Sequence, residues 1–486
     1  MGAAGCGVIT VTDLFAGAGG SSTGATSVPG VQVRMAANHW PLAIETHALN
    51  HPSTDHDCAD ISQVDPRRYP RTDILWASPE CTNHSVAKGK RRAGSTPDMF
   101  GLTLPDEAAE RSRATMWDVP RFAEHHRYRA IVVENVVDAA RWVLWESWLH
   151  AMRALGYRCQ LVYANSMHAQ AFGLPAPQSR DRMYVVATRE GDRAPDVASV
   201  LRPAAVCSEC GPVRAVQSWK RPDRPWGRYR AQYVYRCPNS ACRNQIVEPA
   251  WLPAASAIDW DIRGQRIGDR ERPLAPKTMA RIEAGLRRYA RPFTAEVAGN
   301  TFERRPGVRT WPADEPLKTL HTTLSKALIV PVEGRDGVNA RPASDPLRTS
   351  TARLQDGLVV MMRGQNTAKE AAEPFDTFAA GGNHHSLISW DHLVVDFNGP
   401  ARPASDVLPT QTTVEGNALA SVEVDVSDCL FRMLEPSEIK RGMAFPADYV
   451  VRGNRREQVK QAGNAVCPPN ARDLVGAVVA ALGGAA

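Results

Sequence analysis

The chain has 486 residues, of which 43% are hydrophobic and 23% charged, a composition that excludes an intrinsically disordered protein. Its length exceeds that of a usual single domain, so we expect at least two domains. The formal net charge of +6, from 58 basic and 52 acidic residues, is too small to identify a nucleic-acid partner by itself.

The first ten residues contain no basic segment that leads into a long apolar run, and no later stretch reaches roughly 18 apolar residues. We therefore expect no membrane partner and a cytoplasmic location. Six of the ten cysteines are scattered, and the other four form two close pairs. Reduced thiols and a bound metal explain this arrangement better than a disulfide framework does.

Four apolar segments in the first 189 residues are rich in β-branched residues, and polar residues follow each of them. They are Val8–Phe15, Asp73–Ala77, Ala130–Val133 and Met183–Ala187. Their alternation with helical stretches predicts an α/β fold with a doubly wound, mostly parallel sheet. The sites of such folds lie beyond the carboxyl ends of the strands.

A glycine-rich turn, DLFAGAGG, follows the first expected strand and precedes an expected helix. Gly17 and Gly19 permit positive φ and a close approach of the backbone to a ligand. An adenosyl cofactor is therefore a candidate ligand of this turn. A tight turn without a ligand is the alternative.

Two strand ends carry groups suited to nucleophilic catalysis. The segment SPEC ends in Cys81 and follows the second expected strand, and Glu134 and Asn135 follow the third. In a parallel sheet these two ends face one crevice. Arg180 and Arg182 could lower the pKa of Cys81 and bind a phosphate. A buried, inert thiol is the alternative for Cys81.

After residue 189 the sequence becomes rich in Pro and Arg, and it contains the pairs CxxC and CxxxxC. Four thiolates at this spacing suit a tetrahedral structural zinc in a ribbon of about residues 205–245. A catalytic zinc is disfavoured, because four thiolates leave no open coordination position. The expected ligands are Cys207, Cys210, Cys237 and Cys242.

Nine Lys or Arg and only two acids lie from Arg202 to Arg243, with five aromatic residues between them. This segment is the strongest local candidate for phosphate contact. The alternative is a zinc-bound module that only stiffens the inserted region.

A motif with an Ala, an acid and a Thr in fixed order recurs about every thirty residues, starting at Ala313, Ala343, Ala371 and Ala404. Most copies lead into a short apolar run. We interpret this pattern as an array of turn-and-strand units over about 311–421. Chance similarity in a Pro-rich region is the alternative.

The motifs DLFAGAGG, SPEC, ENV, QSRDR and QAGNAV occur in an order that resembles the DNA cytosine-5 methyltransferases. The resemblance covers about residues 8–190 and 428–480. It implies three parts, which are a catalytic domain with the cofactor pocket, an inserted zinc-containing, strand- and turn-rich target-recognition region, and a segment that completes the catalytic domain. Their expected bounds are 1–189, 190–427 and 428–486.

This resemblance implies transfer of a methyl group from S-adenosylmethionine to C5 of cytosine in duplex DNA, with the base rotated out of the helix. Cys81 would add to C6 of the base, and Glu134 would hold its N3 and amino edge. Asn135 would orient the loop, while Arg180 and Arg182 would steady the base and backbone.

Trp40 would pack on the adenine of the cofactor. Among the departures from the family pattern, Glu80 stands where a second proline is usual, and His39 stands where an acid usually binds the ribose hydroxyls. The implied cofactor residues are Phe15, Gly17, Gly19, His39, Trp40, Asp60, Ile61, Asn464 and Val466.

Two other functions stay open. One branch of the family methylates cytosine in tRNA, although the large inserted region favours DNA. A DNA-binding relative with weakened catalysis is the second. We expect a monomer in a bacterium or a phage-infected cell, with duplex DNA as its partner. Restriction-modification is a candidate role, with a cognate restriction endonuclease as a further partner.

Overall fold

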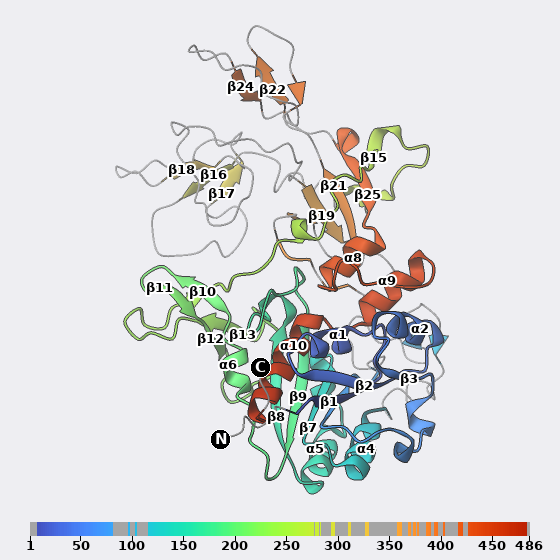
Figure 1. Cartoon of the computed structure of the whole chain (residues 1–486). Helices are drawn as coiled ribbons and strands as arrows, with labels where there is room; N and C mark the ends of the chain where they lie inside the picture. The colour runs from blue at the N-terminus through green and yellow to red at the C-terminus, as the bar shows by residue number, and fades with distance from the viewer. Residues whose placement is uncertain are drawn as a thin grey trace. The chain divides into compact units, whose positions relative to one another are not determined.

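The computed structural model in Figure 1 leaves the expected nucleophile, Cys81, and most residues of the four repeats outside the part of the chain that it describes. The described residues are 7–80, 96–97, 103–104, 115–276, 278–280, 282, 293–296, 310–312, 326–329, 357–361, 368–370, 373–375, 377–378, 385–389, 393–396, 402–403, 417–420 and 426–483.

The chain forms two compact units. The first comprises Met1–Ala257, Pro374–Asn383 and Glu435–Ala486, and the second comprises Ile258–Glu373 and His384–Leu434. The first unit extends well past residue 189, the expected end of the first catalytic segment. This extension has a physical reason, because the cysteine-rich segment shares buried contacts with Met167 of the preceding segment.

The first unit is built on a seven-stranded sheet. Its first five strands in spatial order are parallel, and β9 is antiparallel to both β7 and β8. The expectation of a mostly parallel sheet is therefore confirmed. In spatial order the strands are β3 (Asp55–Asp57), β2 (Val31–Ala37), β1 (Ile9–Leu14), β4 (Ile74–Ala77), β7 (Ala130–Asn135), β9 (Asp181–Arg189) and β8 (Tyr157–Asn165).

Helices cover both faces of this sheet. Side chains of successive strand residues point to opposite faces, and here both faces carry apolar side chains that the helices bury. Leu75 and Ile131 pack in the cluster that contains α4 and α5, whereas Trp76 and Val132 pack in the cluster that contains α10. No helix among the described residues has the length and apolarity needed to cross a membrane. The helices among the described residues of this unit are α1 (Gly20–Thr26), α2 (Pro41–Asn50), α4 (Asp118–His126), α5 (Trp145–Ala154), α6 (Val197–Val200), α8 (Pro436–Gly442), α9 (Arg455–Asn464) and α10 (Pro468–Ala481).

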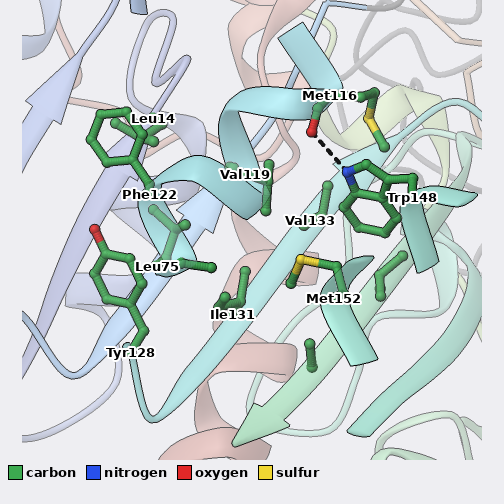
Figure 2. Packing of buried hydrophobic residues seen from close by; sticks show 14 of the residues in the cluster. Leu14, Leu75, Met116, Val119, Phe122, Tyr128, Ile131, Val133, Trp148 and Met152 are labelled. Atoms are coloured by element: carbon green, nitrogen blue, oxygen red, sulfur yellow. Dashed lines mark hydrogen bonds between the residues drawn. The ribbon is translucent and has the colours of Figure 1, made fainter. Parts of the chain in front are cut away.

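Figure 2 shows how the first of these two clusters is fixed in place. Trp148 of α5 is fully buried, and its indole Nε1 donates a hydrogen bond of 2.7 Å to the carbonyl oxygen of Met116. A buried indole N–H needs such a partner. This bond ties α5 to the segment that precedes α4, and both helices support β7.

The C-terminal helices join the glycine turn at a close contact. A Cβ added at Gly20 would lie 2.0 Å from the carbonyl oxygen of Val466. Only glycine permits this approach. In addition, the Tyr449 hydroxyl donates a hydrogen bond of 2.5 Å to the carbonyl oxygen of Ala18. The segment after residue 435 therefore folds onto the turn that follows β1.

We use the name cysteine ribbon for residues 204–247, which contain the four clustered cysteines. It consists of a two-stranded and a three-stranded antiparallel sheet. Its strands are β10 (Ala204–Cys207), β11 (Gly211–Arg214), β12 (Val216–Trp219), β13 (Tyr233–Arg236) and β14 (Ile246–Val247).

The second unit is rich in short strands. Three of these strands lie at the apolar runs that follow the repeats, and two of them, β19 and β21, pair in antiparallel fashion. The strands expected after these copies are therefore present. The strands of this unit are β15 (Gln265–Arg266), β16 (Phe293–Glu296), β17 (Thr310–Pro312), β18 (Lys326–Ile329), β19 (Gly357–Met361), β20 (Ala368–Glu370), β21 (His385–Ser389), β22 (Leu393–Asp396), β23 (Arg402–Pro403), β24 (Asn417–Ala420) and β25 (Leu430–Met433). The remaining described strands of the chain are β5 (Thr96–Pro97) and β6 (Thr103–Leu104).

Three histidines connect α2 and β3 to α1. His47 Nε2 lies 2.9 Å from Ser22 Oγ, and its Nδ1 lies 2.8 Å from His56 Nε2. His51 Nε2 lies 3.2 Å from Thr23 Oγ1. Burial, together with the neighbouring His56, lowers the pKa of His51 to about 4. This imidazole is therefore neutral in the folded protein at neutral pH.

We predict that the wild-type protein loses stability as the pH falls from 6.5 to 4, and that His51→Gln loses about 3 kcal/mol less over this range. The folded state leaves His51 neutral until about pH 4, whereas the unfolded chain takes up the proton near pH 6.5. Protons in this window therefore favour unfolding. Urea unfolding across the pH range measures the difference, and parallel curves for the two proteins would contradict the prediction.

Candidate active site

The ends of β4 and β7 and the start of β9 lie side by side. Ala77 of β4 is paired with Val133 of β7, and Glu134 is paired with Tyr184 of β9. Because β9 is antiparallel to β7, the first residues of β9 lie beside the last residues of β7. The motifs SPEC, ENV and QSRDR therefore meet at one edge of the sheet.

Glu134 and Arg182 form an ion pair at this edge. The Arg182 Nε lies 2.8 Å from the Glu134 Oε1, and the two side chains are only 12% and 15% exposed, the arginine being the more exposed. Arg182 Nη1 also donates to the carbonyl oxygen of Asp181 at 3.0 Å. The carboxylate is therefore held by a charge-assisted hydrogen bond in a partly desolvated place, where such bonds are strong.

Asn135 connects the end of β7 to the loop that leads into the expected nucleophile. Its Nδ2 donates to the carbonyl oxygen of Pro79 at 3.4 Å, and its Oδ1 accepts from the Val136 amide at 2.8 Å. The backbone amide of Ser78 donates to the carbonyl oxygen of Leu14, which fixes the same loop to β1. Asn135 thus orients the segment just before Cys81.

Arg180 lies differently from the expectation. Its side chain is buried, and its guanidinium donates to the carbonyl oxygens of Phe378, Gly463 and Ala465 at 3.0, 3.1 and 3.2 Å. Burial lowers its pKa to about 10. A phosphate contact by Arg180 does not fit this geometry, because the guanidinium is buried against the carbonyl oxygens of Phe378 and of two residues of the C-terminal segment. The residue instead fixes that segment to the start of β9.

The glycine turn has the shape needed for a ligand. Phe15 has φ of 59°, a conformation that costs a bulky residue about 1–3 kcal/mol and is concentrated at functional sites. Gly17 has φ of 54°, and a Cβ there would meet no atom of the described chain within 4 Å. Gly19 allows the Tyr449 side chain to pack against the turn, since a Cβ at Gly19 would lie 2.4 Å from the Tyr449 hydroxyl. Backbone open to a ligand is thus found at Gly17.

Trp40, which caps the N-terminus of α2, already has a partner on its ring. The Lys460 ammonium lies 4.2 Å from the centre of the indole ring. Lys460 belongs to α9, so this cation–π contact brings α9 next to the residue expected to pack on adenine. Lys460 is absent from the residues expected at this site, although its position one helical turn before Asn464 could have indicated it.

His39 and Glu80, the two departures from the family pattern, contact each other. The His39 Nδ1 lies 3.5 Å from the Glu80 Oε1, and the side chains are 58% and 38% exposed. Exposed pairs of this kind contribute little to stability. Their contact nevertheless brings a carboxylate from the loop after β4 to the position that follows β2.

The remaining expected cofactor residues lie at element ends. Asp60 caps a short helix by accepting from the Ser62 amide at 3.1 Å, and Ile61 is buried. Asn464 is the last residue of α9 and is exposed, whereas Val466 is buried against the glycine turn. These groups suit an adenosyl cofactor. They are the open backbone at Gly17, the aromatic ring of Trp40 and the helix end at Asn464.

The four clustered cysteines come together as expected. Their Sγ atoms all lie within 4.8 Å of one another, and tetrahedral zinc–thiolate geometry requires about 3.8 Å between sulfurs. The Cys210 amide lies 3.4 Å from the Cys207 Sγ, and the Gln245 Nε2 lies 2.8 Å from it. Such N–H groups stabilise thiolates. The donor set therefore fits zinc.

The aromatic residues of the cysteine ribbon form its core and do not form an exposed nucleic-acid surface. Tyr229, Tyr233 and Tyr235 are buried together with three of the four cysteines. Trp219 and Trp226 are partly buried against the catalytic sheet's core. These rings are therefore structural, and the prediction of phosphate contact by this segment rests on its Lys and Arg residues alone. The physical reason is that a short ribbon without a large core must bury its own aromatic residues.

The chain is similar to known methyltransferases over part of its length. The chain is 29% identical over 180 residues to Type II methyltransferase M1.ScrFI of Lactococcus lactis subsp. cremoris, and 28% identical over 183 residues to Type II methyltransferase M.NlaX of Neisseria lactamica. These matches cover 36% of this chain, and the chain spans 40% and 51% of the two relatives.

Among solved structures, the Dnmt2 methyltransferase of S. pombe aligns at 11% identity with a TM-score of 0.46 over 98% of each chain. The family described as C-5 cytosine-specific DNA methylase matches residues 9–202 and 347–480, which is more than half of the chain. This protein therefore belongs to the C-5 cytosine-specific DNA methylase family.

Proposed function

We propose that this protein transfers a methyl group from S-adenosylmethionine to C5 of cytosine in duplex DNA, within a specific sequence. The observation that carries the proposal is the buried Glu134–Arg182 pair, next to the loop that Asn135 fixes before Cys81. A carboxyl group held in this way suits the N3 and amino edge of cytosine. Membership of the family supports the same chemistry.

In the proposed mechanism the Cys81 thiolate forms a bond from its Sγ to C6 of cytosine. The electron pair of the C5–C6 double bond becomes available at C5, and the Glu134 carboxyl group donates a proton to N3, which balances the negative charge that the thiolate brings to the ring. S-adenosylmethionine, when bound, supplies an electrophilic methyl group. C5 would take that methyl group as the bond between the methyl carbon and the sulfonium sulfur breaks, and S-adenosylhomocysteine would be the leaving product. Loss of the C5 proton then restores the double bond and expels the thiolate of Cys81.

Arg182 holds Glu134 in position for this chemistry. Its Nε occupies one carboxylate oxygen at 2.8 Å, which fixes the orientation of the other oxygen. A carboxyl group that is already held in place stabilises the transition state more than a mobile one, because it does not have to be ordered during the reaction. Asn135 does the same for the loop before Cys81 through its bond to Pro79.

Cytosine C5 and C6 are inaccessible inside a stacked duplex, so the reaction requires the base to rotate out, at a cost of a few kcal/mol. Contacts with duplex DNA must offset this cost. We assign these contacts to the inserted region 190–427, which we propose as the target-recognition domain. The Type II names of the relatives support a restriction-modification role. We further propose a cognate restriction endonuclease as partner and a monomeric methyltransferase.

We also propose that Cys207, Cys210, Cys237 and Cys242 hold one structural zinc. Four thiolates complete a tetrahedral shell and leave no position for substrate. The metal would stabilise two turns that the small core of the ribbon cannot fix alone. Arg243 and Asn244, in the second turn, have φ of 55° and 50°, which such a closed turn can hold in place.

Cys81→Ser should abolish methyl transfer, with a loss of more than about 10³-fold in kcat. A serine hydroxyl is not ionised at neutral pH and adds to C6 far more weakly than a thiolate. Transfer of labelled methyl to duplex DNA, run in parallel with tRNA, measures the effect, and binding to DNA should persist. Substantial turnover by the variant would remove Cys81 from the mechanism, and label on tRNA alone would favour the RNA function.

Glu134→Gln should lower kcat by about 10²- to 10³-fold, because the amide cannot balance charge at N3. The amide keeps the size of the side chain, so affinity for DNA should change little. Glu190→Gln is a matched control, since Glu190 is exposed just after β9. Steady-state kinetics on one duplex compares the three proteins. Equal loss in both variants would show that Glu134 has no special role.

Metal analysis of the purified protein should find about one zinc per chain. The double variant Cys207→Ala, Cys210→Ala should lose the metal, because two remaining thiolates cannot complete the shell. Cys58→Ala is the control, as Cys58 is exposed and lies outside the cluster. A double variant that retains its zinc would refute the assignment.

A further inference from the structure

The cysteine ribbon contacts the segment that directly follows Glu134 and Asn135. The Trp226 indole Nε1 donates to the carbonyl oxygen of Val137 at 2.9 Å. The Arg228 Nη2 lies 2.5 Å from the Oδ2 of Asp138, whose side chain is only 8% exposed. Asp138 is a buried carboxylate, so its partner matters, because an uncompensated buried charge is costly.

The ribbon also contacts the first residue of β9. The Tyr229 amide donates to the Oδ1 of Asp181 at 3.0 Å. Asp181 is the neighbour of Arg182 in the sequence. Two bonds from the short segment Trp226–Tyr229 therefore reach the short helix Val137–Arg141 after β7, and a third reaches the first residue of β9. All three end within four residues of Glu134 or Arg182.

The same segment is joined to the four-cysteine site through a buried aromatic core. Tyr229 packs against Tyr233 and Tyr235, with ring centres 5.7 and 5.6 Å apart. Cys237 follows β13, which carries both of these tyrosines, and it is buried in the same cluster. A packed core transmits displacements because it has few voids to absorb them.

We propose that the cysteine ribbon is a positioning element for catalysis, which holds the Glu134–Arg182 pair through Trp226, Arg228 and Tyr229. In this role Arg228 is a positioning residue that touches neither substrate nor cofactor. The ribbon then sets the rate of methyl transfer, and affinity for DNA depends on the rest of the inserted region 190–427. This inference rests on the proposed function, since it takes the Glu134–Arg182 pair as part of the catalytic machinery.

The decisive experiment compares Arg228→Gln with the double variant Arg228→Gln, Asp138→Asn. The single variant leaves a buried carboxylate without its cation, which should displace the segment after Glu134 and lower kcat by about 10- to 100-fold. The double variant pairs two neutral amides and should recover most of that loss. KM for S-adenosylmethionine and affinity for duplex DNA should stay near the wild-type values in both.

Arg221→Gln is the matched control, because it removes the same charge from the same ribbon. Arg221 is exposed and pairs with Asp223, which also belongs to the ribbon. Its kcat should equal that of the wild type. If Arg228→Gln leaves kcat unchanged, or if its loss is one of DNA affinity shared with Arg221→Gln, the ribbon is not a positioning element.

Hydrogen exchange gives a readout independent of activity. The amides of residues 134–138 and 181–184 should exchange faster in Arg228→Gln, and not in Arg221→Gln, while the zinc content of both equals that of the wild type. Removing the metal with a chelator should accelerate the same amides. Unchanged exchange in Arg228→Gln would overturn the inference even if the wild type methylates DNA. If the wild type transfers no methyl group, these exchange rates still decide whether the ribbon holds the pair.

Discussion

The ion pair between Glu134 and Arg182 depends on one topological feature, the antiparallel insertion of β9 beside β7. If β9 ran parallel to its neighbours, its first residues would lie at the opposite edge of the sheet, far from the end of β7. The reversed strand brings QSRDR to the edge where SPEC and ENV end. Two neighbouring residues fix the segments around the pair. Asn135 fixes the loop beside it, and Arg180 fixes the C-terminal segment behind it.

Much of the catalytic half could be predicted from the sequence because its signals are local. An apolar run followed by polar residues indicates a strand and its functional end, and this was sufficient for β1, β4 and β7. The metal site at the four cysteines could also be predicted from the sequence, since two pairs of thiols at short spacing are typical of a metal site. In each case the informative residues lie close together along the chain.

The parts that could not be predicted depend on distant partners. The sequence cannot show that Arg180 donates to carbonyl oxygens of a segment almost three hundred residues later. In the sequence alone, a buried arginine of this kind therefore cannot be distinguished from one that binds a phosphate. In the same way, Arg228 lies in a basic segment, although its partner Asp138 lies ninety residues earlier. His39 and Glu80 are separate departures in the sequence, yet they contact each other. Their contact places a carboxylate from the loop after β4 beside His39.

The central claim is that this site methylates C5 of cytosine in duplex DNA. The most direct measurement is sequencing at base resolution of duplex DNA that has been incubated with the protein and S-adenosylmethionine. We expect methyl groups at C5 of cytosine within one recurrent short sequence. Methylation at an amino group of adenine or cytosine would contradict this claim, because neither reaction uses a cysteine adduct at C6.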